Sequence, residues 1–352
     1  LGDEADSPRG RLYLMRSVVE GRLDPGSPAF QTHIDRCLGC RACEPVCPSG
    51  VEYGHLLERA REAAVEARPP TPAARILLSI MGYPMLEGLF MAFSRALRWS
   101  RLPALAARIL PEGGWTGRGR FALGMLAASE RTHGWRRSSR GKAPTGDART
   151  GNSPGRQMEA ALSSGVETAR DGTRPRIGLL TGCVQEGLFS RVNRATARVL
   201  EANGFDVVTV AGQGCCGALH AHGGLVDRAR ELARTNIAAF EAAEVDLVVV
   251  NAAGCGSTMK DYGELLERDG EWARRASALA DRVRDVSEVL ADAGPRAGGE
   301  LPVRVAYDPP CHLLHAQRVE DAPSRLLAAI PELETVPLAN AEECCGGAGI
   351  YG

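Results

Sequence analysis

The spacing of apolar residues in the first part of the chain predicts helices. Leu12, Met15 and Val18 recur at helical intervals and predict a short amphipathic helix that ends near Gly21. A second helix is predicted over Leu56 to Arg68, where a Pro-Pro pair stops it. A cysteine-rich run lies between the two helices.

The pattern changes in the second half, where short apolar runs alternate with helical segments. Three buried strands are predicted at residues 177–180, 206–210 and 246–250, and helices at residues 195–202 and 229–243. Strands that alternate with helices favour a parallel sheet with crossover helices. The carboxyl ends of such strands are where α/β folds gather their ligand sites.

Two segments connect these halves. Residues 76–93 are apolar over almost a membrane-spanning length, but Pro84 and Glu87 interrupt them, so packed helices in contact with a partner or a membrane surface are favoured over a spanning helix. Residues 131–175 lose periodicity and read as a flexible basic linker, with a phosphate- or lipid-binding tail as the alternative. The basic residues of that segment include Arg136, Arg137, Arg140, Lys142 and Arg149.

The cysteines are the part of the composition that says most about the class of protein. The 352 residues carry a net charge of −1, which gives no reason to expect nucleic acid as a partner. Eleven cysteines are an odd number and cluster at metal-ligand spacings, unlike a disulfide scaffold. No signal peptide opens the sequence, so we expect a reducing cytoplasm, with the inner face of the cytoplasmic membrane as a second expected location.

The first cluster of thiols predicts an iron–sulfur site. Cys37, Cys40, Cys43 and Cys47, followed by Pro48, fit C-x2-C-x2-C-x3-C-P, the bacterial [4Fe–4S] ferredoxin run. Structural zinc is the alternative, but zinc sites usually draw on two separated cysteine pairs. The spacing therefore favours a cubane cluster.

Cys47 admits two interpretations. In two-cluster ferredoxins the fourth cysteine ligates the other cluster, and no second run exists in these residues. Because the sequence begins at Leu1 and stops just after a Cys-Cys-Gly-Gly, we expect a fragment cut at both ends, and a longer chain that binds about eight irons at this end. Alternatively, Cys47 closes a single cluster.

The remaining thiols lie in an internal repeat. Cys183 is followed after 31 residues by Cys215-Cys216-Gly217, and Cys311 after 32 residues by Cys344-Cys345-Gly346. This matched spacing indicates duplication, with a further Gly-Cys expected about forty residues past Cys345, by analogy with Cys255 in the first copy.

In the first copy, four thiols on loops at one sheet edge predict a metal site, with inert buried thiols as the alternative. The set comprises Cys183, Cys215, Cys216 and Cys255. Flanking glycines, which allow tight turns of the backbone, are Gly214, Gly217, Gly254 and Gly256. Four histidines could be ligands, proton carriers or packing groups, namely His220, His222, His312 and His315.

Other catalytic signatures are absent from the sequence. It has no Gly-x-Gly-x-x-Gly after a strand, no Walker loop and no acyl-transfer motif. We therefore expect no flavin on this chain and no substrate site, so that substrate oxidation belongs to another subunit.

Together these motifs resemble the iron–sulfur subunit of glycolate oxidase (glycolate dehydrogenase). The ferredoxin run through Val51 is similar to that family's second cluster motif, and residues 1–11 resemble the stretch after its first. Thr181-Gly182-Cys183-Val184-Gln185, Gly214 to Gly217 and Ala253 to Gly256 are similar to its cysteine-rich domain. The likeness covers most of the chain and is weakest between residues 70 and 172.

The resemblance implies one or two [4Fe–4S] clusters at the N-terminal domain of the intact protein, and a further cluster at the Cys-Cys-Gly motifs. It implies FAD-binding dehydrogenase subunits that oxidise glycolate to glyoxylate, a 2-hydroxy acid reaction, and electrons passed toward membrane quinone. Lactate and glycerol-3-phosphate dehydrogenase subunits and heterodisulfide reductase share the layout. In the last, the motif ends in Cys-x-x-Cys, whereas this chain has Cys255-Gly256-Ser257-Thr258, which argues against a five-thiolate site.

The expected fold is α+β, a helical ferredoxin-type domain followed by a duplicated α/β cysteine-rich domain with an incomplete second copy. The expected domains are residues 1–68 (ferredoxin-type), 69–130 (helical connector), 131–174 (linker), 175–298 (first repeat) and 299–352 (second repeat). The competing functions are an electron-transfer subunit, a heterodisulfide-reductase-like enzyme and a zinc-stabilised interaction module.

Overall fold

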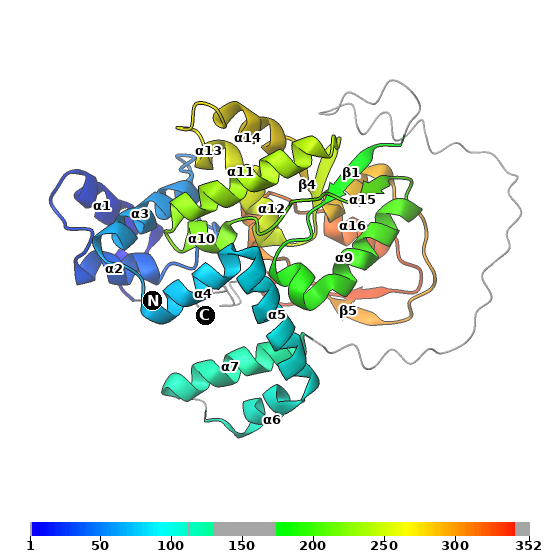
Figure 1. Ribbon diagram of the computed structural model, residues 1–352, viewed down its shortest axis with the longest axis horizontal. Coiled ribbons are helices and arrows are strands. Elements are labelled where there is room, and N and C mark those ends of the chain that lie inside the picture. Colours follow the sequence, from blue (N-terminus) through cyan, green and yellow to red (C-terminus); the bar gives the residue numbers. More distant parts are fainter. Residues whose placement is uncertain (1, 112, 130–173, 342–352) are drawn as a thin grey trace, which may run out of the picture.

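A computed structural model describes residues 2–111, 113–129 and 174–341. A group of helices formed by the first residues lies beside a parallel sheet with helices on both faces, and a helical arm projects from the junction between them (Figure 1). Cys344, Cys345 and the predicted basic linker lie outside the described residues. The α+β class predicted from the sequence is confirmed.

The N-terminal helices surround the ferredoxin-type run. They are η1 (Glu4–Asp6), α1 (Pro8–Val19), α2 (Pro28–Asp35) and α3 (Tyr53–Ala67). Ser7 and Ser27 cap α1 and α2 with side-chain oxygens, and a proline occupies the first turn of each. Their apolar faces meet in a small core that includes Phe30, Ile34 and Leu57. The two helices predicted here are confirmed.

Four helices follow, and the last three form the arm. They are α4 (Pro72–Gly82), α5 (Pro84–Trp99), α6 (Leu102–Ile109) and α7 (Gly114–Ala128). The apolar stretch breaks at Tyr83, where the axes of α4 and α5 bend by 105°. Among the described residues no single helix is long and apolar enough to cross a membrane, and only this bent pair reaches that length together.

The second half contains a four-stranded parallel sheet of order β2-β1-β3-β4. Its strands are β1 (Arg176–Leu179), β2 (Asp206–Val208), β3 (Leu247–Val250) and β4 (Val283–Asp285). The first three were predicted, and β4 was missed because Val283 is its only apolar residue.

Helices cover both faces of this sheet. They are α9 (Val184–Ala202), α10 (Ala218–His222), α11 (Val226–Ala242), α12 (Ala253–Lys260), α13 (Tyr262–Leu265), α14 (Ala273–Ala280) and α15 (Val286–Ala293). Alternate residues of β3 face opposite ways, so Val248 joins the core beneath α11 whereas Val249 joins the core beneath α9 and α15. This two-sided burial explains why β3 is an unbroken apolar run.

The described part of the second repeat begins in the same way as the first. Strand β5 (Arg304–Ala306) leads through η3 (His312–Ala316) and α16 (Ala322–Ala328) to β6 (Glu334–Val336). The strands β5 and β6 pair in parallel, as β1 and β2 do in the first copy. This shared arrangement supports the duplication inferred from the cysteine spacing.

Candidate metal centres

The ferredoxin-type run forms the loop between α2 and α3. Cys37 and Cys43 pack against the N-terminal core. The loop turns sharply at Gly39 and Arg41, where φ is 66° and 60°. The first cysteine of the run is fixed by α3, because Tyr53 donates a hydrogen bond to Cys37 Sγ (3.7 Å) and Arg61 donates one to the Cys37 carbonyl oxygen (2.5 Å). The thiols are therefore held by packed helices rather than by the loop alone.

The structure separates Cys47 from the other three thiols. Burial, followed by the neighbouring Cys37 and Cys40, raises the pKa of Cys43 to about 11. The pKa of Cys47 is instead lowered by backbone N–H groups, chiefly that of Val51, with no contribution from another cysteine. Cys43 thus neighbours Cys37 and Cys40, whereas Cys47 lies among backbone donors.

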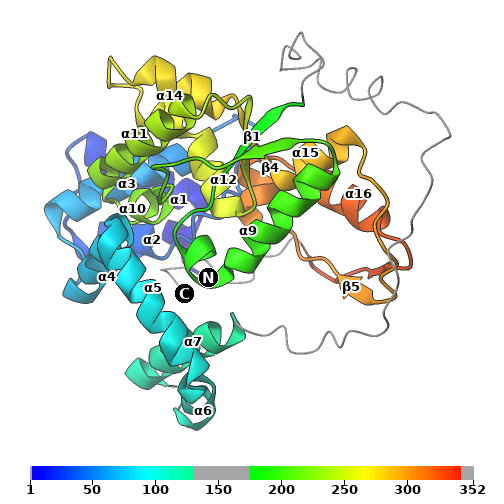
Figure 2. The same cartoon turned by 45° about the vertical axis from the view of Figure 1, so that its right-hand side comes forward.

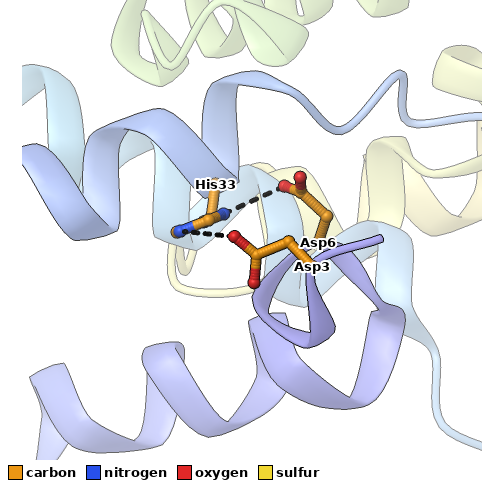
Figure 3. A group of neighbouring side chains, drawn as sticks. All are labelled: Asp3, Asp6 and His33. Atoms are coloured by element: carbon orange, nitrogen blue, oxygen red, sulfur yellow. Dashed lines mark hydrogen bonds and ion pairs between the residues drawn. The ribbon is translucent and has the colours of Figure 1, made fainter. Parts of the chain in front are cut away.

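A group of charged residues anchors the start of the run. Figure 3 shows Asp3 and Asp6 facing the two ring nitrogens of His33, with 3.0 Å between Asp6 Oδ1 and His33 Nδ1. Asp6 also receives hydrogen bonds from Arg11 (3.2 Å) and Arg36 (3.1 Å). Because two guanidinium groups already neutralise Asp6, this cluster is a structural network that holds the residue before Cys37, not a cation site.

The second group of thiols is brought together from three elements. Cys183 neighbours Cys215, Cys215 neighbours Cys216, and Cys216 neighbours Cys255, closely enough for each pair to shift one another's pKa. Cys183 follows β1 and Cys215-Cys216 follow β2, so these loops meet at the carboxyl edge of the sheet. Cys183, Cys215 and Cys216 are buried. The segments that carry these thiols thus lie at one edge of the sheet, and a metal site formed by the four residues stays a prediction.

The environment of these thiols suits a cation. The hydrogen bond to Cys215 and burial both raise the pKa of Cys183. In Cys215 the bond from Cys183 lowers the pKa, but the bond to Cys216 and burial outweigh it, so the pKa is raised to about 12. Thiolates gathered here would repel one another in a dry site, and a bound metal centre would supply the missing positive charge.

The spread of the thiols is relevant to the zinc alternative. Thiolates around one tetrahedral zinc ion lie about 3.8 Å apart, given Zn–S bonds of about 2.3 Å. Among the described residues no three cysteine sulfurs lie within 4.8 Å of one another. Among the described residues, therefore, neither thiol group has the tight spacing of a single zinc site.

The prediction that Cys255 lies on a loop is wrong. Cys255 belongs to the first turn of α12, which begins three residues after β3 ends. Gly256 lets the Gln317 side chain pack closely against the helix, because a Cβ at this position would lie only 2.7 Å from Gln317 Nε2. It does not form a tight turn. The loop assignment is correct for Cys215-Cys216, where Gly217 has a φ of 89°.

Two buried polar residues that the sequence did not reveal hold the Cys-Cys loop. Asn236 on α11 accepts from the Gly214 N–H (2.9 Å) and donates to the Cys215 carbonyl oxygen (2.8 Å). Tyr262 Oη donates to the Cys216 carbonyl oxygen (2.8 Å) and accepts from Asn236 (3.3 Å). Because both side chains are fully buried, this pair clamps the backbone on either side of both thiols. An asparagine within a helical pattern carries no signal of such a role.

Two contacts join the thiol groups across the junction. Arg41, inside the ferredoxin-type run, donates a hydrogen bond to Asp261 at the end of α12 (2.7 Å). His312 Nε2 donates a hydrogen bond to the Gly39 carbonyl oxygen (3.1 Å). Its Nδ1 packs against Gly254, 3.5 Å from the point that a Cβ on this residue would occupy. His312 therefore touches one residue next to Cys40 and one next to Cys255.

His220 and His222 also make contacts close to this junction. His222 stacks on His312 at 5.3 Å between ring centroids, and its Nδ1 lies 3.0 Å from Glu58 Oε1. His220 is buried and bonds to the Leu78 carbonyl oxygen (2.9 Å). Burial, then the neighbouring His222, lowers the pKa of His312 to about 4, so its imidazole is neutral at pH 7. The packing interpretation fits His220, whereas His312 bridges the two thiol groups.

Replacing His312 with Ala should loosen this bridge. The variant removes the donor to the partly buried Gly39 carbonyl oxygen, a loss of about 0.5–1.5 kcal/mol to the local structure. We expect a chelator to remove iron faster from the ferredoxin-type run, with iron at the second thiol group unaffected. The matched control is His315→Ala, on the same short helix. Equal chelation rates for wild type and His312→Ala would contradict the bridge.

The thiols of the second repeat are described only in part. Cys311 directly precedes η3, which packs against α12, where Gln317 donates a hydrogen bond to the Ala253 carbonyl oxygen (2.9 Å). The second copy thus brings Cys311 toward the helix that carries Cys255.

Comparison with known proteins supports this organisation. A family model described as "Cysteine-rich domain" matches residues 177–260 and 305–352. The chain is 34% identical to the probable glycolate oxidase iron–sulfur subunit of Bacillus subtilis (strain 168), over 99% of this chain and 74% of that protein. It is 30% identical to the glycolate oxidase iron–sulfur subunit of Escherichia coli (strain K12), over 100% of this chain and 75% of that protein.

A third relative covers a smaller part. Lactate utilization protein A of Exiguobacterium sp. is 31% identical over 50% of this chain and 73% of that protein. The fold, the two groups of thiols and these relatives define an iron–sulfur electron-transfer subunit of a dehydrogenase complex. The chain belongs to the family of glycolate oxidase iron–sulfur subunits.

Proposed function

We propose that this subunit carries electrons from a flavoprotein that oxidises glycolate to glyoxylate toward membrane quinone. The observation that carries the proposal is the junction where His312 bonds to Gly39, beside Cys40, and Arg41 bonds to Asp261, at the end of the helix that carries Cys255. Electron transfer needs redox centres held in fixed positions by rigid protein, and these contacts support such an arrangement.

The proposed ligands follow the grouping of the thiols. Cys37, Cys40 and Cys43 hold three corners of one [4Fe–4S] cluster, and Cys47 serves a second cluster of the intact protein. Further iron–sulfur ligands are Cys183, Cys215, Cys216 and Cys255, together with Cys311, Cys344 and Cys345 of the second repeat. When bound, such clusters accept and release single electrons.

The protein's own residues tune and protect these centres. The Tyr53 hydroxyl and the backbone donors around Cys47 stabilise negative charge on sulfur, which is one of the means by which a protein sets a cluster potential. The Asn236–Tyr262 clamp fixes the Cys-Cys loop, and its burial keeps water away from the thiols.

Cluster reduction by substrate tests the proposal. The full-length protein is purified anaerobically with its flavoprotein partner, and bleaching of the iron–sulfur absorbance is followed after addition of glycolate, lactate or glycerol 3-phosphate. We expect glycolate to bleach the clusters fastest. Faster bleaching by lactate would favour the alternative suggested by the similarity to lactate utilization protein A. If metal analysis found zinc and no acid-labile sulfide, both the glycolate and the lactate alternative would be overturned.

A heterodisulfide-reductase-like activity is the second candidate. It would require the Cys-Cys-Gly centre itself to perform thiol chemistry. Thr258 stands where the longer motif would supply its last cysteine, and it is buried in α12. This arrangement favours a centre that only passes electrons.

A further inference from the structure

Helix α5 is apolar on two opposite faces. Met91 is buried on the side that packs against α9, where Arg95 donates a hydrogen bond to the Gly187 carbonyl oxygen (3.0 Å). The opposite side is also apolar, and its residues recur at helical spacing in solvent. These exposed residues are Met85, Leu86, Leu89, Phe90 and Phe93, of which Leu89 and Phe93 are 65% and 66% exposed. Packing within the subunit therefore accounts for only one face of α5.

The neighbouring helices of the arm continue this exposed apolar surface. Trp99, at the end of α5, is 84% exposed. The further exposed residues are Leu102, Leu105 and Ile109 of α6 and Phe121 and Met125 of α7. Figures 1 and 2 both show α6 and α7 at the far end of α5, away from the sheet and from the N-terminal helices. Accordingly, a flat surface could reach the arm without touching either thiol group.

The charges of this segment have a single predominant sign. Residues 72–128 contain seven arginines, two glutamates, and neither lysine nor aspartate. Arg75, Arg101 and Arg108 are exposed beside the apolar residues. The whole chain, by contrast, is close to neutral, with a net charge of −1. Positive charge is thus concentrated on the segment that exposes apolar side chains.

We propose that the arm formed by α5, α6 and α7 is a peripheral docking surface for an anionic lipid bilayer. Short helices with exposed Leu, Phe and Trp side chains and flanking arginines are the elements that lie in the plane of a membrane interface. Arginines attract the negative lipid headgroups, while the apolar stripes enter the acyl boundary. This proposal does not depend on which 2-hydroxy acid the complex oxidises.

The charge pattern favours lipid over a protein partner as the occupant. Specific protein interfaces carry polar groups of both signs that fix the register of the partner. The exposed surface of this segment instead combines apolar residues with mainly positive charge, which suits a fluid surface of uniform negative charge. Such binding needs no defined register, only area and positive potential.

Vesicle flotation with the full-length, cluster-loaded protein tests the proposal. Vesicles contain phosphatidylcholine with or without 30% phosphatidylglycerol, an anionic fraction of about the size that gives the cytoplasmic leaflet its negative potential. We expect binding to the anionic vesicles at least about tenfold tighter than to neutral ones, falling as salt screens the charge. The double variant Leu89→Glu/Phe93→Glu should lose that binding. Val19→Glu/Val199→Glu, which alters two exposed apolar residues outside the arm, should retain it.

Three outcomes would overturn the proposal. The first is the absence of wild-type binding to anionic vesicles, and the second is equal binding of the two double variants. The third is loss of the flavoprotein from the Leu89→Glu/Phe93→Glu variant with vesicle binding intact, which would assign the arm to a protein partner. Unchanged iron content and circular dichroism confirm that each variant is folded.

Discussion

Replacing Cys40 with Ser is expected to abolish electron transfer through the N-terminal centre. The variant removes one of the three thiols that the structure groups together, and a cluster with two corners unheld is lost. The rate of cluster-dependent electron transfer should fall by more than about 100-fold, since loss of an outer-shell partner alone costs up to that much. Iron content should fall by about four atoms per chain in the full-length protein. Iron and sulfide analysis with EPR of the reduced protein measures both effects.

Cys47→Ser provides the comparison that assigns the fourth thiol. If Cys47 ligates a different cluster, the two variants lose different EPR signals and the double variant loses both. If Cys47 closes the same cluster, both variants lose the same signal. Val46→Ser is the matched control, because Val46 lies beside Cys47 in the same loop and is 78% exposed. Retention of all iron in Cys40→Ser would refute the proposed ligand set.

Local sequence patterns predicted the parts of this fold that depend on nearby residues. The apolar run Leu247–Val250 is buried on both sides, so its composition alone reveals β3. The break at Pro84 follows from the fixed ring of proline. The cysteine spacings predicted which thiols would come together, because parallel strands end at one edge of a sheet.

Features that depend on distant contacts could not be predicted in this way. The sequence left His312 open as ligand, proton carrier or packing group, and its role follows from Gly39, 273 residues away in the chain. Cys255 was placed on a loop because its flanking glycines suggest turns, yet Gly256 makes room for the Gln317 side chain. In both cases the deciding contact joins the second repeat to an earlier part of the chain, which no local window contains.

The clamp at the Cys-Cys loop leads to the second large expected effect. Asn236→Leu keeps the branched shape of the side chain but leaves the partly buried Gly214 N–H and the buried Cys215 carbonyl oxygen unpaired. Each unsatisfied group costs about 1–3 kcal/mol, so we expect a loss of about 2–5 kcal/mol in the free energy of unfolding of the cysteine-rich domain. Anaerobic denaturant unfolding, followed by circular dichroism, measures this loss.

Two further variants separate the clamp from general damage to α11. Tyr262→Phe removes only the hydroxyl that donates to the Cys216 carbonyl oxygen, so it should cost about 1–3 kcal/mol. Thr235→Ala, at the exposed neighbouring position of α11, should stay within about 0.5 kcal/mol of wild type. Because the clamp fixes the backbone of both thiols, Asn236→Leu should also lose iron from the second centre while the ferredoxin-type cluster remains. A stable Asn236→Leu variant with full iron content would show that the thiols keep their positions without the clamp.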